Sequence, residues 1–355
     1  MQVKYVIIVA MMIVAVAALA APAGAAASYP MTVTDNFGRN VTIAHAPQRI
    51  VSLSSANTEI LFALGAGGRI VGDTQYDTYP PEAANITHVG GFADTLGNID
   101  IESIVNVTPD LIICEDAISE KAVNQLTGMG YPVIVLKNSN ISMIESNIRL
   151  IGQATDTSSN ATALVNGMES QFSAIRARTA GLTDAQRPSV LFMAGYLQGQ
   201  EIYVYGKDTF GDELVQMAGG KNVVTQSGYP VISPEAIISA DPDWVIIPVD
   251  GAMCTMDDYN YFKNGSDTRF AALSAIKDGH VVMTDGLVEY PGPRLPAAAQ
   301  EVYQAINPGA SYTVTPAGNA TAVPTASSTP APGFEGLVAL AGLLGGGCLI
   351  MRQKR

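Results

Sequence analysis

Two segments of the chain share one construction at identical spacing, residues 102–113 (ESIVNVTPDLII) and 235–246 (EAIISADPDWVI). Each contains a glutamate, a short apolar stretch, a Pro-Asp pair and a second apolar run. Proline ends a helix, and the aspartate that follows favours a turn into a strand. The repeat therefore predicts two halves of similar topology, with Glu102 and Glu235 at equivalent helix starts. A carboxylate there also favours the helix dipole, so a purely structural role for both residues stays open.

Short apolar runs alternate with helical stretches in both halves of the chain. Continuous Val/Ile runs are typical of strands buried on both faces, and their alternation with helices indicates βαβ units with parallel sheets. The sequence predicts an α/β fold with two Rossmann-like lobes, residues 28–141 and 183–307. The expected strands are residues 49–53, 69–72, 111–114 and 132–136 in the first lobe, and 189–193, 202–205, 244–248 and 280–284 in the second.

A helical segment, residues 142–182, joins the predicted lobes. Its apolar residues recur mostly at three- and four-residue steps, the period of one helix face. We expect one long, stiff connecting helix that limits domain closure, with residues 155–160 as a candidate break.

The two ends of the chain predict a location outside the cell. Residues 1–27 combine an early lysine, an apolar run and an Ala-rich exit, which is typical of a secretory signal peptide; a permanent membrane span is the alternative. Residues 308–331 are rich in Pro, Thr, Ala and Ser, as in a flexible stalk. Residues 332–355 run from Pro-Gly-Phe through an apolar stretch to a basic end. This order resembles the archaeal PGF-CTERM sorting signal, which implies removal of the tail and a lipid anchor, with a plain transmembrane anchor as the alternative.

Charge and motifs exclude nucleic acid as a partner and argue against catalysis. The net charge of −13 excludes nucleic-acid binding through phosphate neutralisation. Neither a nucleophile elbow, a P-loop nor a His-Glu metalloprotease motif occurs, so we do not expect an enzyme, although a secreted enzyme and a surface adhesion protein remain alternatives. Glycosylation sequons, typical of a cell-surface glycoprotein, begin at Asn40, Asn85, Asn106, Asn140, Asn160, Asn264 and Asn319.

Several spaced motifs resemble the periplasmic binding proteins for cobalamin, haem and ferric siderophores. They are residues 47–65 (PQRIVSLSSANTEILFALG), 76–83 (YDTYPPEA), 89–92 (VGGF), 209–214 (TFGDEL), 218–223 (AGGKNV), 292–295 (GPRL) and the two Glu segments. The resemblance spans roughly residues 31–307. It implies two α/β lobes joined by one long helix, with a ligand cleft between them, in the solute-binding component of an ABC importer. It also implies that Glu102 and Glu235 dock onto arginines of the membrane permease, which works with an ATPase.

The same resemblance implies an aromatic ligand site. The matching positions are Tyr76, Phe92 and Tyr229, and less securely aligned candidates are Tyr196, Tyr203, Tyr290 and Arg294. Aromatic rings bury a large area with few rotors, which suits a large planar ligand, but some of these residues can equally belong to the core. Arg294 can pair with an anionic group of a ligand or with a neighbouring acidic residue.

The ligand is expected to be a metal chelate and the protein a monomer without a resident cofactor. His45, His88 and His280 are widely separated and have no helical ligand spacing, so a free metal ion is a poor candidate. We favour a corrinoid such as cobalamin, because residues 76–83 and Phe92 resemble the cobalamin-binding branch and arginines are few and scattered. A ferric siderophore or haem is the alternative.

Overall fold

The computed structural model describes residues 28–90, 99–196, 201–249, 254–286 and 290–309. The predicted signal peptide, Phe92, and residues 310–355 of the predicted stalk and sorting signal lie outside these ranges. Within them, no helix combines the length and hydrophobicity needed to cross a membrane.

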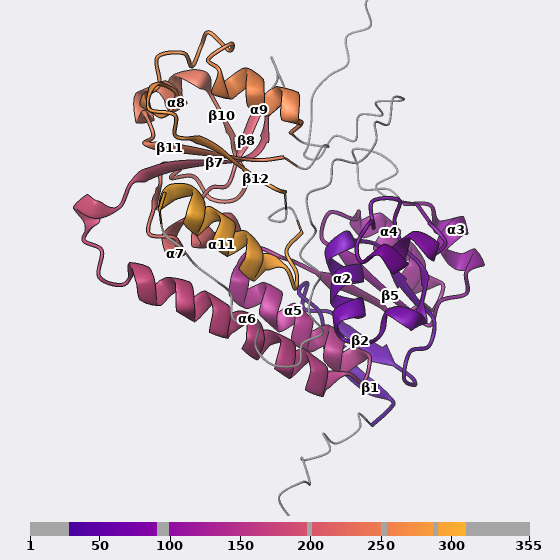
Figure 1. The fold of residues 1–355 in the computed structure, drawn as a ribbon. Helices are drawn as coiled ribbons and strands as arrows, with labels where there is room; N and C mark the ends of the chain where they lie inside the picture. The colour runs from indigo at the N-terminus through magenta and orange to yellow at the C-terminus, as the bar shows by residue number, and fades with distance from the viewer. Residues whose placement is uncertain (1–27, 91–98, 197–200, 250–253, 287–289, 310–355) are drawn as a thin grey trace, which may run out of the picture.

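The first lobe contains a four-stranded parallel sheet in the order β4-β3-β5-β6 (Figure 1). All four predicted strands of this lobe are confirmed. The strands are β3 (Ile50–Ser52), β4 (Ile70–Gly72), β5 (Leu111–Glu115) and β6 (Val133–Leu136), and the helices are α2 (Ser55–Ala63), α3 (Ile101–Asn106) and α4 (Glu120–Gly128). Short 3-10 helices occupy Gly67–Arg69 and Pro81–Asn85.

An antiparallel hairpin that the sequence did not predict precedes this sheet. Its strands are β1 (Met31–Thr34) and β2 (Asn40–Ile43). The buried carboxylate of Asp35 accepts hydrogen bonds from the backbone of Arg39 and from its guanidinium, and also from the backbone N–H of Val135 in β6. One side chain therefore closes the hairpin turn and attaches it to the edge of the sheet.

The second lobe contains a sheet in the order β10-β8-β7-β11-β12, with β9 beside the start of β7. The four predicted strands are present, and the sheet is mixed: β7 is parallel to β9 and β11, and β11 to β12, as expected, whereas β8 pairs antiparallel with both β7 and β10. The strands are β7 (Ser189–Tyr196), β8 (Ile202–Val204), β9 (Lys221–Asn222), β10 (Val231–Ile232), β11 (Trp244–Pro248) and β12 (Val281–Thr284). The helices are α7 (Phe210–Met217), α8 (Pro234–Ala240), α9 (Met256–Lys263), α10 (Ser274–Lys277) and α11 (Leu295–Ile306).

The sequence repeat has the same backbone in both lobes. Thr108 and Asp241, the residues before the two Pro-Asp pairs, both have positive φ, 44° and 39°. A non-glycine residue adopts this left-handed conformation rarely, and it ends the preceding helix sharply. Helices α3 and α8 therefore stop at equivalent points before equivalent strands.

The aspartate of each Pro-Asp pair ties two neighbouring strands together. The Asp110 carboxylate accepts the backbone N–H groups of Gln48 and Arg49, at 2.8 and 2.9 Å, just before β3. Asp243 accepts the backbone N–H and the hydroxyl of Ser189, both at 2.7 Å, at the start of β7. In both lobes the aspartate of the repeat thus holds the end of the short helix at the amino end of the sheet through hydrogen bonds.

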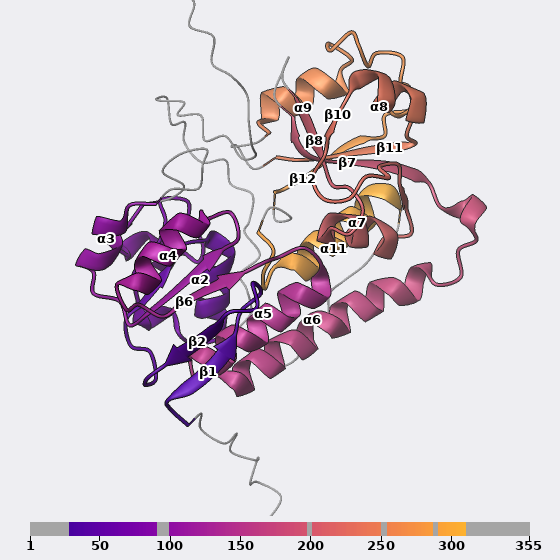
Figure 2. The ribbon, with the colours of Figure 1, turned by 180° about the vertical axis from the view of Figure 1, so that it is seen from behind.

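Two helices, rather than one, join the lobes. The predicted helix over residues 142–182 is divided into α5 (Ile141–Ala154) and α6 (Ser158–Thr179), and the division falls within the segment that the sequence indicated. The two helices lie side by side in both views (Figures 1 and 2). They pack closely at Gly152, where an added Cβ would lie 2.4 Å from the side chain of Ala161. The 22-residue α6 continues to the second lobe and contacts α7 and α11.

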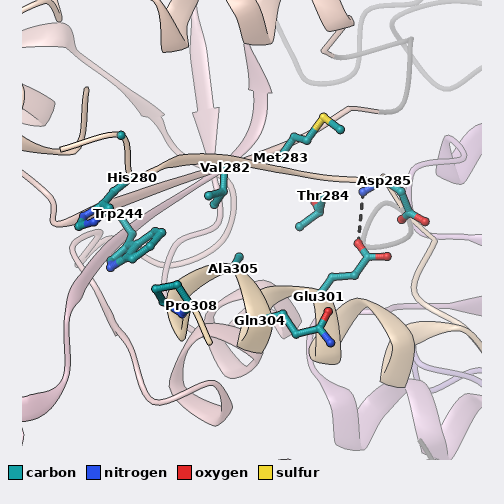
Figure 3. A pocket seen from close by; sticks show the side chains of 11 residues that line it. Trp244, His280, Val282, Met283, Thr284, Asp285, Glu301, Gln304, Ala305 and Pro308 are labelled. Carbon is teal, nitrogen blue, oxygen red and sulfur yellow. Dashed lines mark hydrogen bonds between the residues drawn. The ribbon is translucent and has the colours of Figure 1, made fainter. Parts of the chain in front are cut away.

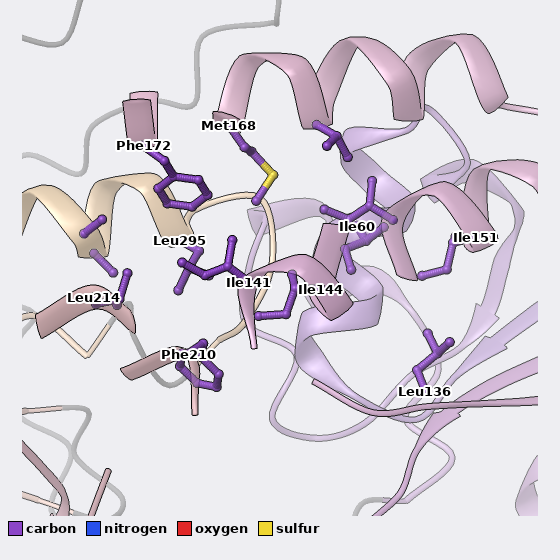
Figure 4. Close-up of a cluster of buried hydrophobic side chains, with 14 of the residues drawn as sticks. Ile60, Leu136, Ile141, Ile144, Ile151, Met168, Phe172, Phe210, Leu214 and Leu295 are labelled. Carbon is purple, nitrogen blue, oxygen red and sulfur yellow. The ribbon is translucent and has the colours of Figure 1, made fainter. Parts of the chain in front are cut away.

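One hydrophobic core runs through the junction between the lobes (Figure 4). It includes Ile60 of the first lobe, Ile144 of α5, Phe172 of α6, Phe210 of α7 and Leu295 of α11, each 4% exposed or less. Burial of this apolar surface favours a fixed arrangement of the lobes, because separating them would expose it to water. The packing supports the expectation of a stiff connector.

A half-buried carboxyl pair lies between the two connecting helices. Glu145 of α5 faces Glu169 of α6, and burial, with Glu169 as the second cause, raises the pKa of Glu145 from 4.5 to about 7. The folded protein therefore retains this proton at a pH where the unfolded chain has released it. The free energy of unfolding accordingly falls as pH rises from about 4.5 to about 7.

Glu145→Gln should therefore raise the melting temperature at pH 8 by about 2–4 °C and give little gain at pH 4. Thermal denaturation followed by circular dichroism at both pH values measures this difference. Glu82→Gln, at an exposed position of the first lobe, is the matched control and should give no such pH dependence. An equal gain from Glu145→Gln at both pH values would contradict the assignment.

Candidate functional site

The carboxyl ends of the strands in the two lobes face a common junction. The segment after β12 contacts α2, which follows the carboxyl end of β3, because Arg294 binds Glu59 there. The backbone N–H of Ile141, just after β6, donates to the Glu213 carboxylate of α7 at 2.7 Å. Ligands of open α/β sheets bind beyond the carboxyl ends of their strands. The candidate site therefore lies where these two edges meet.

Tyr76 stands on a turn that a buried carboxylate holds in place. The turn follows β4, and the phenol ring is 37% exposed. Asp77, which is 2% exposed, accepts hydroxyl hydrogen bonds of 2.6–2.7 Å from Ser55 and Thr58 of α2 and from Thr74. The backbone N–H of Tyr76 donates to the Thr74 hydroxyl. The network fixes the turn against the first turn of α2 and leaves the ring partly open to solvent.

Tyr229, just before β10, is a partly exposed tyrosine of the second lobe. It is also 37% exposed, and its ring packs edge-on against Tyr205 with centroids 5.4 Å apart. Tyr205 in turn contacts Phe210 of α7, the helix whose Glu213 reaches the first lobe. Each lobe therefore has one of the predicted ligand tyrosines partly exposed, and their shared role in a ligand site stays a prediction.

Arg294 links the lobes through an ion pair. Its guanidinium binds both carboxylate oxygens of Glu59, with the Nε–Oε2 distance at 2.8 Å, and the side chains are 15% and 3% exposed. The same guanidinium lies 4.2 Å from the ring centroid of Tyr79 and 5.5 Å from that of Tyr290. Burial raises the pKa of Glu59, and Arg294 opposes this rise. Glu59 binds Nε and Nη2 of the guanidinium, so Arg294 contributes to the junction, and its role toward a ligand stays a prediction.

The other predicted ligand residues within the described ranges, Tyr196, Tyr203 and Tyr290, differ in their exposure to solvent. Tyr196 is 0% exposed, packs against Phe262 and donates its hydroxyl to Asp267, so it belongs to the core and presents no surface to a ligand. Tyr203 is partly exposed on β8 and donates its hydroxyl to Glu201. Tyr290 is also partly exposed, beside Arg294.

Carboxylates gather at the carboxyl edge of the first sheet. Burial raises the pKa of Asp73 to about 6, and His88 opposes this rise at 2.7 Å. Burial also raises the pKa of Glu115 and of Asp116. The hydroxyl of Ser54 and the amide of Asn138 donate to Glu115. Raised pKa values favour the protonated forms of these carboxyls, so this edge presents acidic groups that can hydrogen-bond to a ligand rather than a fixed negative charge.

A separate pocket of about 680 Å³ lies in the second lobe between β12 and α11 (Figure 3). Trp244 stacks on His280 at one end, with centroids 4.0 Å apart. At the other end the Asp285 N–H donates to Glu301, whose pKa is raised to about 7 by burial and then by Asp285. No predicted ligand residue lines it. The lining residues are Trp244, Gly279, His280, Val282, Met283, Thr284, Asp285, Glu301, Gln304, Ala305 and Pro308.

Within the described ranges, no group of three or more His, Cys, Asp or Glu side chains is placed to hold a metal ion.

Glu102 and Glu235 are exposed and lie in the first turns of α3 and α8. Both helices are capped by a preceding side chain, Asp100 in one and Ser233 in the other. Figures 1 and 2 show α3 and α8 on the sides of their lobes that lie away from α6. The two glutamates are therefore available on the outer surface of the molecule.

Comparison with known proteins decides the family. Residues 50–286 match the periplasmic binding protein family. The chain belongs to this family. It is a family of substrate-binding proteins, and the prediction of its membership and of its two-lobed α/β fold is confirmed.

Three similar proteins illustrate the relationship. The uncharacterized ABC transporter substrate-binding lipoprotein YvrC of Bacillus subtilis is 30% identical over 286 residues, which cover 79% of this chain and 86% of that protein. A cobalamin-binding protein of Halobacterium salinarum is 30% identical over 234 residues, 64% of this chain and 61% of that protein. The structure of a periplasmic heme binding protein from Pseudomonas aeruginosa is 26% identical, with a TM-score of 0.67, and covers 76% of this chain and 96% of its own.

Sequence reasoning missed three residues that organise the site, Glu59, Asp77 and Tyr79. All three lie within the quoted motifs. The sequence signal for Glu59 was the polar run Asn57-Thr58-Glu59, which precedes the apolar residues of α2 without forming a polar face of the helix. Polar residues buried in a helix require partners, and these come from turns far away in the sequence.

Arg294→Met should destabilise the protein by about 3–5 kcal/mol, because it leaves the Glu59 carboxylate buried without its partner. Chemical denaturation measures the loss. Glu59→Gln in the same background should recover a large part of it. Arg176→Met is the matched control, since its ion pair with Glu169 is exposed and such pairs contribute about 0–1 kcal/mol. Equal losses from the two arginine substitutions would show that the Glu59 pair does not hold the lobes together.

Proposed function

We propose that this protein captures a corrinoid of the cobalamin type outside the cell and delivers it to the permease of an ABC importer. The observation that carries the proposal is the pair of partly exposed tyrosines, Tyr76 in the first lobe and Tyr229 in the second. We place the two rings on opposing walls of the cleft, where each can stack on a broad, flat ligand. We propose Tyr203 and Tyr290 as additional contacts, and Phe92 as a further one outside the described residues.

The acidic edge of the first lobe favours a corrinoid over an anionic chelate. Asp73, Glu115 and Asp116 lie at this edge, and the Arg294 guanidinium already binds Glu59. Haem carries two propionates, and many ferric siderophores are anionic, so neither finds a basic partner among these residues. A corrinoid presents many neutral amide groups, which hydrogen-bond to carboxyl groups in either protonation state. The cobalamin-binding relative from Halobacterium salinarum supports the same choice.

Haem or a ferric siderophore is the second candidate, because the similar Pseudomonas aeruginosa structure is that of a heme binding protein. Residues 28–309 should be titrated with cobalamin, haemin and a ferric siderophore, followed by calorimetry and visible absorbance. We expect one-to-one binding that is strongest for cobalamin. Tightest binding of haemin or siderophore would replace the corrinoid while keeping the binding-protein role, and binding of free Zn²⁺ alone would overturn both.

Tyr76→Ala and Tyr229→Ala should each weaken ligand binding by about 1–3 kcal/mol, the range for a buried aromatic contact. The folded variants should keep their secondary structure and melting temperature. Tyr131→Ala is the control, because Tyr131 packs against the core just before the amino end of β6, away from the carboxyl edge. Unchanged affinity in both test variants would place the ligand elsewhere, with the pocket beside α11 as the next site to test.

We also propose that Glu102 and Glu235 dock the protein onto basic residues of the permease. The two carboxylates are exposed, and equivalent Asp hydrogen bonds hold their helices to the two sheets. Each lobe thus presents the same charge to a permease of two similar halves. Such complementarity fixes orientation and speeds encounter. A tether at the C-terminal end of the chain would keep the protein at the outer face of the membrane, where we expect it to act as a monomer.

Glu102→Lys combined with Glu235→Lys should abolish permease binding and uptake while ligand affinity stays nearly constant. Like charges brought together at an interface cost several kcal/mol, whereas losing an exposed helix-start carboxylate costs under about 1 kcal/mol of stability. Single reversals should give partial, salt-sensitive defects. Permease binding by the folded double variant at the level of the unmodified protein would leave both glutamates as helix-start charges.

A further inference from the structure

Each proposed docking glutamate has an apolar residue one helical turn after it. Val105 follows Glu102 by three residues on α3, and Ile238 follows Glu235 by three residues on α8. Side chains three apart on a helix are neighbours on one face. The spacing is the same in the two lobes because it is part of the sequence repeat.

The opposite face of each short helix is anchored in a core. Ile104 and Ile237, the residues just before the two apolar neighbours, are both 0% exposed and belong to the cores of their own lobes. A helix anchored at this position turns its glutamate and the residue three positions later outward. The outward direction of both pairs is therefore set by the packing of the helix.

The two lobes differ in how far the apolar neighbour projects. Ile238 is 44% exposed, although isoleucine is among the residues most often buried. Val105 is only partly exposed and packs against the core of the first lobe. The helix of the second lobe therefore presents an apolar side chain beside an exposed carboxylate, in a position fixed by its core contacts.

We propose that Ile238, with a smaller contribution from Val105, forms the apolar centre of the permease-docking surface, and that each permease half offers an apolar socket flanked by a basic residue. The inference rests on the proposed docking role of Glu102 and Glu235. Exposed ion pairs alone contribute little affinity, since they are solvated and screened. Lasting association depends on apolar groups near the centre of an interface, with charges around them. The second lobe, with its more open isoleucine, makes the stronger of the two contacts.

The test compares threonine substitutions in the full chain, captured by its permease and ATPase in lipid nanodiscs. Ile238→Thr should weaken binding by about five- to tenfold, the effect of uncovering roughly half of a buried isoleucine side chain, and Val105→Thr should weaken it less. Met283→Thr is the matched control. Met283 is 49% exposed on the edge strand β12 of the same lobe, and its substitution should leave permease binding unchanged.

Salt separates the apolar contact from the charged one. At about 1 M salt the screening length falls to about 3 Å, so the defect of Glu235→Lys should shrink, whereas the defect of Ile238→Thr should persist. Cobalamin affinity, measured in parallel on each variant, should not change.

Three outcomes decide between the hypotheses. If charge reversal abolishes docking but Ile238→Thr and Met283→Thr bind the permease equally well, the apolar contact is overturned and the docking role of the glutamates stands. If neither charge reversal nor Ile238→Thr has an effect, the docking face itself is overturned. If the Ile238→Thr defect disappears at high salt together with that of Glu235→Lys, Ile238 is not an apolar contact.

Discussion

The apolar packing where the lobes meet is the constraint on which the rest of the structure depends. Residues of α2, α5, α6, α7 and α11 contribute to one core, so neither lobe completes its own hydrophobic interior without the other. The Glu59–Arg294 pair closes the same junction with charge. A buried ion pair contributes orientation more reliably than net stability, because desolvation offsets its attraction. The apolar core therefore holds the lobes together, and the ion pair fixes how α2 meets the segment before α11.

Much of the fold could be predicted from the sequence because strands buried in parallel sheets appear as continuous Val/Ile runs. Each of the eight predicted runs became a strand. The hairpin β1–β2 was not predictable in the same way, since its four-residue strands depend on Asp35 reaching β6, a contact across about a hundred residues. The direction of β8 was also hidden, because a three-residue apolar run looks the same in parallel and antiparallel sheets.

The candidate site was only partly predictable, for a related reason. Aromatic residues are useful both in cores and in ligand sites, and the sequence does not say which side of a sheet edge a ring will occupy. Tyr196 and Tyr229 were both candidates, Tyr229 the better aligned of the two, and Tyr196 lies buried beside Phe262 whereas Tyr229 is partly exposed beside Tyr205. Arg294 was ambiguous until its partner appeared at Glu59, 235 residues away. Partners at such separations are set by the fold as a whole.

The repeat explains how a binding protein can present two functions on separate surfaces. The carboxyl ends of the strands face the junction and bear the candidate ligand residues, while Asp110 and Asp243 fasten α3 and α8 at the amino ends of the same sheets. Each helix that bears a proposed docking glutamate is thus fixed to the sheet of its lobe and not to a loop of the candidate site. The separation of Glu102 and Glu235 is then determined by the angle between the lobes, which the junction core restricts. It follows that any ligand-induced change in that angle would move α3 and α8 together with their sheets. The distance between Glu102 and Glu235 would then differ between the ligand-free and ligand-bound protein, and a partner that binds both glutamates could distinguish the two states.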